Sequence, residues 1–79
     1  MSVMFEVLYK SPRDPAREAA LADRLGRFGG RLTEIENPSR PGDPVTLTCE
    51  FDGWPGATEA AAILRAAGEH VEGPGEYGD

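Results

Sequence analysis

The single histidine, His70, is the side chain best suited to proton transfer near neutral pH, and it lies in a segment with two glutamates. Alternation along a short strand would place Glu72 on the same side as His70 and Glu69 on the other side. A histidine beside a carboxylate can act as a general base when a nucleophile lies within reach. The residues around His70 supply no such nucleophile. We therefore favour an exposed histidine on the sheet and keep general-base chemistry as the alternative.

Carboxylates in the middle of the chain form the second group of residues that could do chemistry. Glu34 and Glu36 share one face of a predicted strand, and Glu50 could approach them across a hairpin. Paired carboxylates can bind a hard cation or perform acid–base work. Charges of this kind are also typical of an edge strand, where they prevent pairing with other chains, and we favour that interpretation. With His70 and Glu72, these glutamates define an alternative hypothesis, a small enzyme or metal-binding protein.

The only cysteine, Cys49, excludes an internal disulfide and a paired-cysteine metal or redox site. It lies on the apolar side of its predicted strand, where a cysteine behaves as a small buried hydrophobe. From the sequence we assign no catalytic, cofactor-binding or metal-binding residue, and we expect no cofactor.

Charge is distributed unevenly along the chain. The formal net charge is −6, which disfavours binding to nucleic acid and to anionic membranes. Residues 10–31 nevertheless contain six basic and three acidic residues. Arg17, Arg24 and Arg27, called the arginine flank below, fall within an arc of about 80° on a helix. They could dock an acidic surface, or their stems could cover the edge of the core.

Hydrophobic periodicity and turn residues indicate the elements that must position these side chains. They predict strands at 3–10, 31–36 and 45–51, helices from Asp14-Pro15 to Gly29 and at 57–67, and a short fourth strand at 69–72. Prolines predict a loop at 37–44 and a turn at 52–56 that contains Trp54. Trp54 either packs on the core or, if exposed, anchors a partner. We expect one domain at 1–73 and a flexible tail at 74–79.

This order predicts an α+β, ferredoxin-like βαββαβ sandwich of two layers. Its antiparallel sheet should have the strand order 4-1-3-2, with two helices on one face. The open face should present Met4, Glu6, Leu8, Thr46, Thr48 and Glu50. The topology is similar to that of copper-chaperone, RNA-recognition, acylphosphatase and ACT domains. Apart from Arg13 in the first loop, the residues that carry those families' chemistry are absent from the corresponding positions. The resemblance therefore implies a fold and no particular function.

These features predict a non-catalytic protein-interaction or ligand-sensing module that associates with a protein partner or as a homodimer. The candidate contact residues are Met4 and Leu8 on the open face, Trp54, and the arginine flank. We expect a cytoplasmic protein, because the first residues lack a signal-peptide pattern and no apolar run approaches the roughly 20 residues of a membrane span. Seven arginines against one lysine and abundant alanine indicate a bacterial origin.

Overall fold

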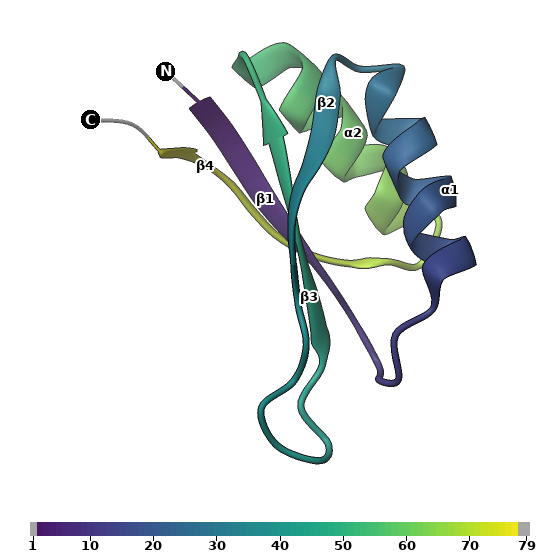
Figure 1. The fold of residues 1–79 in the computed structure, drawn as a ribbon. Helices are drawn as coiled ribbons and strands as arrows, with labels where there is room; N and C mark the ends of the chain where they lie inside the picture. The colour runs from purple at the N-terminus through teal and green to yellow at the C-terminus, as the bar shows by residue number, and fades with distance from the viewer. Residues whose placement is uncertain (1, 78–79) are drawn as a thin grey trace.

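Two layers make up the structure, a computed structural model that describes residues 2–77 (Figure 1). The elements in chain order are β1 (Ser2–Tyr9), α1 (Pro15–Gly26), β2 (Gly30–Glu36), β3 (Val45–Phe51), α2 (Trp54–Ala66) and β4 (His70–Tyr77). The four strands form one antiparallel sheet in the order β2-β3-β1-β4, which is the predicted order read from the opposite edge. Both helices cover the same face (Figure 1), so the ferredoxin-like fold is confirmed. Within residues 2–77, every helix is too short or too polar to cross a membrane.

The core lies between the sheet and the helices, and alternate residues of the two central strands form its floor. The buried strand residues are Val3, Phe5, Val7 and Tyr9 of β1, and Val45, Leu47, Cys49 and Phe51 of β3. Helix α1 contributes Leu21 and Leu25. Helix α2 contributes mostly alanines, with Leu64 as its largest buried side chain. The strict alternation in β1 and β3 therefore decides which face of the sheet is left for function.

Helix α1 ends earlier than predicted, and helix α2 begins earlier than predicted. Helix α1 begins as expected, with the Asp14 side chain accepting a hydrogen bond of 3.1 Å from the Arg17 amide. It ends at Gly26, so Phe28 lies in the following turn, although it still packs against the core. Helix α2 begins at Trp54 rather than at residue 57, which corrects the predicted turn at 52–56. Pro55 fits the first helical turn because an amide there needs no partner within the helix.

The fourth strand is longer than predicted. β4 runs from His70 to Tyr77, and Gly75, Glu76 and Tyr77 pair with β1. The tail predicted at 74–79 thus overlaps this strand at residues 74–77, and residues 78–79 lie outside the described part of the chain. Gly73 has a φ of +106°, and the pairing register between β4 and β1 shifts between Met4 and Glu6. This local irregularity allows β4 to continue past Pro74.

Helix α2 covers part of the outer edge of β4. The Arg65 guanidinium donates hydrogen bonds to the backbone carbonyls of Val71 and Gly73. Pro74 has no backbone N–H to offer at this edge. These contacts obstruct the addition of another strand to β4.

A chain that ends at Gly73 should melt at a markedly lower temperature than the full chain. The deletion removes the strand pairs that end at Tyr77 and the hydrogen bond of 3.0 Å from Trp54 Nε1 to Glu76 Oε2. A loss of ~1 kcal/mol shifts the melting temperature of a domain this small by about 4–8 °C. Thermal denaturation followed by circular dichroism checks this. An unchanged melting temperature would show that the second half of β4 adds nothing to stability.

Candidate functional site

One face of the sheet is left uncovered by the helices (Figure 1). Residues that pair across antiparallel strands point to the same face, so the register defines its composition. Three rows cross the face from β2 to β4: Arg31–Glu50–Met4–Gly75, Glu34–Thr48–Glu6–Glu72 and Glu36–Thr46–Leu8–His70. The predicted open-face positions of β1 and β3 are confirmed, and Met4 and Leu8 are half-buried on the central strand β1, on either side of Glu6.

Negative charge predominates on this face. Within residues 2–77, the three rows hold five glutamates and one arginine. Arg31 Nη2 lies 2.7 Å from Glu50 Oε1 and 3.5 Å from Asp52 Oδ1, so this arginine is already neutralised. Glu6 lies directly opposite Glu72 on β4, and like charges directly opposite each other destabilise a sheet. The repulsion between Glu6 and Glu72 is therefore an electrostatic cost to stability, which other interactions in the fold offset.

The central row, Glu34–Thr48–Glu6–Glu72, contains two glutamates without a local counter-charge. Glu6 and Glu34 flank Thr48 and form no ion pair with any residue that the structure describes. Their charge is therefore available to a bound partner.

A hollow lies at one end of the open face, where β1 ends and β4 begins. Its volume is about 380 Å³, and its lining residues are Leu8, Tyr9, Lys10, Gly42, Pro44 and His70. The β2–β3 loop, which extends beyond the end of the sheet (Figure 1), supplies one wall. A smaller hollow of about 220 Å³ shares Pro44 and is lined by polar residues that include Glu36 and Asp43.

The structure brings together only part of the constellation that the alternative enzyme hypothesis requires. His70 is exposed, and its Nε2 lies 3.4 Å from Glu72 Oε2, as strand alternation predicts. Glu34 and Glu36 lie on β2 at the opposite edge of the sheet. Three strand spacings of about 4.8 Å separate the edges by roughly 14 Å. Within residues 2–77, no three His, Cys, Asp or Glu side chains gather as a metal site would need.

The three members of the arginine flank lie in different surroundings. Arg17 Nη2 lies 2.6 Å from Glu69 Oε1, and its guanidinium carbon lies 4.6 Å from the centre of the Tyr9 ring. Arg24 lines a narrow groove between the helices. Arg27 is exposed, and its Nη2 lies 4.0 Å from Asp23 Oδ2. Arg17 is therefore committed to contacts within the chain, and the other two lie beside the interhelical groove or in solvent.

The remaining two residues singled out from the sequence differ in exposure. Trp54 is 39% exposed at the start of α2, and its indole N–H is held by Glu76. Cys49 is fully buried, as expected, and burial raises the pKa of its thiol to about 12. The thiol therefore stays protonated and unreactive near neutral pH.

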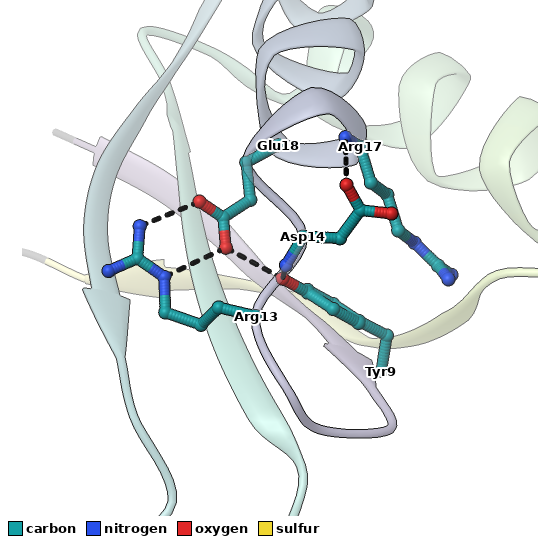
Figure 2. A network of polar contacts seen from close by, with 5 residues as sticks. All are labelled: Tyr9, Arg13, Asp14, Arg17 and Glu18. Carbon is teal, nitrogen blue, oxygen red and sulfur yellow. Dashed lines mark hydrogen bonds and ion pairs between the residues drawn. The ribbon is translucent and has the colours of Figure 1, made fainter.

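A buried polar network joins β1 to α1 (Figure 2). Glu18 is only 4% exposed, and it accepts a hydrogen bond of 2.6 Å from the Tyr9 hydroxyl. Arg13 donates to both carboxylate oxygens of Glu18, at 2.7 Å and 3.1 Å. The Tyr9 hydroxyl also accepts a hydrogen bond of 2.8 Å from the Asp14 amide. Each polar group of this network has a partner, so it is a structural clamp on the loop between β1 and α1.

Sequence reasoning missed this network, although one signal was present. Glu18, Leu21 and Leu25 follow the i, i+3, i+7 spacing of one helix face, so the carboxylate belongs to the core-facing stripe. A carboxylate on such a stripe needs a partner, because an unpaired buried charge is costly. The clamp matters to the candidate site because it holds the loop that follows Lys10, at the rim of the hollow.

The clamp fixes the protonation states of its two acidic groups. The Arg13 guanidinium, and next the Tyr9 hydroxyl, lower the pKa of Glu18 from 4.5 to about 2. Burial, and next the hydrogen bond to Glu18, raise the pKa of Tyr9 above its usual 10. Glu18 is therefore ionised and Tyr9 protonated near neutral pH, so neither is ready to exchange a proton.

The clamp should make folding stability depend on pH in the acidic range. The unfolded chain binds a proton at Glu18 near pH 4.5, whereas the folded chain binds it only near pH 2. The stabilisation is therefore complete above about pH 4.5 and is lost as the pH falls toward about 2. Melting temperatures of Glu18→Gln should lie below those of the unsubstituted chain at neutral pH, and the gap should close on acidification. Glu34→Gln on the edge strand β2 is the matched control. If the difference in melting temperature between Glu18→Gln and the unsubstituted chain does not change with pH, Glu18 does not stabilise the fold as a buried carboxylate.

Neither a scan against models of protein families nor a search of curated proteins finds a match to this chain. The class of protein is therefore defined by the fold and by the surface. The chain is a small ferredoxin-like α+β domain whose open sheet face is acidic, with two apolar residues on its central strand β1 and a hollow at one end.

Proposed function

We propose that this chain is a non-catalytic binding module that docks a basic segment of a protein partner on the open face of its sheet. The observation that carries the proposal is the composition of the three rows. They have a formal charge of −4 with His70 neutral, and Met4 and Leu8 lie on the central strand β1, on either side of Glu6. Protein interfaces combine apolar contacts with charged groups that steer the partner.

Charge complementarity favours a basic partner over the other occupants of the face. Two copies packed sheet to sheet would bring five glutamates against five, so a homodimer through this face is electrostatically disfavoured. Nucleic-acid phosphates and anionic lipids carry the same sign of charge as the face. A homodimer would instead need the arginine flank of one copy to contact the sheet face of another, which the test below distinguishes.

Binding, rather than catalysis, also fits the positions of the titratable side chains. The glutamates are spread over the whole sheet, and His70 meets only Glu72 among them. A general acid–base pair requires groups that converge on one reacting atom. A charged docking surface requires only that its members face the same side, which strand pairing ensures here.

The test uses a synthetic peptide of alternating lysine and leucine, with an alternating glutamate and leucine peptide as its charge-reversed control. We expect the basic peptide to bind and the acidic one not to bind. Glu6→Gln/Glu34→Gln should weaken binding about tenfold, or ~1.4 kcal/mol. Added salt should weaken it as well, because exposed charges are screened beyond about 8 Å. Glu59→Gln, an exposed glutamate on α2, is the matched control and should bind as tightly as the unsubstituted chain.

Two outcomes would overturn the proposal. The first is equal binding by the double variant and the control, which would place the contact elsewhere on the molecule. The second is a stable dimer in sedimentation that dissociates in Arg24→Glu/Arg27→Glu, which would assign the surface to self-association. Both substituted arginines lie at the surface, where substitutions typically change stability by less than ~0.5 kcal/mol.

A further inference from the structure

We infer that the hollow at the end of the open face binds a small organic acid, with its apolar body against Leu8 and Pro44 and its carboxylate between Lys10 and His70. This site shares Leu8 and His70 with one of the three rows that the proposed function uses, but it includes neither Glu6 nor Glu34. It would make the chain a receptor for a small metabolite as well as for a protein partner.

The lining of the hollow has the chemistry that such a ligand needs. Leu8 and Pro44 supply apolar surface, and Lys10, the only lysine of the chain, and His70 supply groups that can donate to a carboxylate. Lys10 follows the end of β1 and His70 starts β4, and the pairing of Leu8 with His70 brings them to one end of the sheet. On a face that is otherwise acidic, the lining of this hollow contains a lysine and no carboxylate.

His70 already contacts one carboxylate. Its Nε2 lies 3.4 Å from Glu72 Oε2, whereas its other ring nitrogen has no hydrogen-bond partner among the described residues. The imidazole is also exposed at 66% of its side-chain surface, so a ligand can reach it. Glu72 can therefore accept from one ring nitrogen while a ligand carboxylate accepts from the other. This arrangement requires a proton on both nitrogens, and two neighbouring carboxylates favour that charged form of the imidazole.

The walls of the hollow are held in place from two sides. The Asp14 amide is bonded to the Tyr9 hydroxyl, so the clamp fixes the chain on both sides of Lys10. On the other side, Pro44 directly precedes β3, whose first residue Val45 is fully buried. A preformed site loses less conformational freedom on binding. The volume of about 380 Å³ lies at the small end of the range for ligand pockets, which suits an aromatic or short aliphatic acid.

The experiment follows backbone amide resonances of the isotope-labelled chain while benzoate is added at constant ionic strength and neutral pH. Benzyl alcohol, which has the same ring without the charge, is added in a parallel titration. We expect benzoate to shift Leu8, Lys10, Gly42 and His70 in a saturable way. Lys10→Gln and His70→Gln should each raise the dissociation constant for benzoate by about tenfold. Benzyl alcohol should bind more weakly, with little change between the variants. Arg24→Gln on α1 is the matched control for loss of a positive charge.

Three results would overturn the inference: no saturable shift with benzoate, shifts that fall outside the hollow, or the same benzoate affinity in Lys10→Gln/His70→Gln as in Arg24→Gln. Both substituted residues are exposed, so the variants should fold, and unchanged resonances far from the hollow verify that they do. The test contains no peptide partner and leaves Glu6 and Glu34 intact. Its failure is therefore distinguishable from failure of the proposed function.

Discussion

Phe51→Ala is expected to lower the free energy of unfolding by about 3–5 kcal/mol, the range for truncation of a fully buried phenylalanine. Phe51 is 1% exposed, and its ring centre lies 5.2 Å from that of Phe5. The ring also fills the space beside Gly30, where a Cβ atom would overlap it. A domain of this size has a total stability on the order of 5 kcal/mol, so the variant should be largely unfolded.

Urea denaturation of Phe51→Ala and of the unsubstituted chain, followed by circular dichroism, measures the difference in their free energies of unfolding. Thr48→Ala is the matched control, because Thr48 lies in the same strand and points to the opposite face. Its substitution should cost less than ~1 kcal/mol, as for most surface positions. If Phe51→Ala costs less than ~1 kcal/mol as well, the helix-covered face of β3 is not the core.

Gly56→Ala should destabilise the chain although the residue lies within a helix. A Cβ atom at Gly56 would overlap the backbone carbonyl oxygen of Phe28, in the turn between α1 and β2. A backbone carbonyl cannot rotate away as a side chain can, so α2 or the turn must shift. Overpacking of this kind costs about 1–3 kcal/mol. The gain in helix propensity from glycine to alanine is at most ~1 kcal/mol, so the net effect should be a loss.

Gly26→Ala is the matched control for Gly56→Ala. Gly26 is the last residue of α1, and a Cβ atom there would meet no atom within 4 Å. Alanine at this position should leave stability unchanged or raise it by up to ~1 kcal/mol. Thermal denaturation of both variants checks the contrast. Equal stability of Gly56→Ala and Gly26→Ala would show that α2 does not lie close to the α1–β2 turn.

Sequence reasoning was reliable where a feature depends on residues close together in the chain. Alternation predicted β1 and β3 and their buried faces, because the side chains of a strand alternate between its two sides. It also predicted that Glu72 shares a side with His70 and that Cys49 is buried. The start of α1 followed from Asp14 and Pro15, which act within one helical turn.

The same reasoning failed where a residue is compatible with two different local structures. Pro55 indicated a turn, and Pro74 indicated the start of a tail. Proline is also compatible with the first turn of a helix and with an edge strand, and these are the places where the fold puts them. Packing of α2 on the sheet and the pairing of β4 with β1 decide between such outcomes, and neither is visible in a short window of sequence.

The sequence by itself determined the order of the elements, the strand order of the sheet and the composition of its open face. Each of these depends on short periodic patterns and on the handedness of strand–helix–strand connections. Only the tertiary structure decided that Lys10, Gly42 and His70 surround one hollow, and that Glu18 is buried beneath Arg13. These relations depend on the register between segments far apart in the chain, where a shift of one residue would move every side chain to the other face.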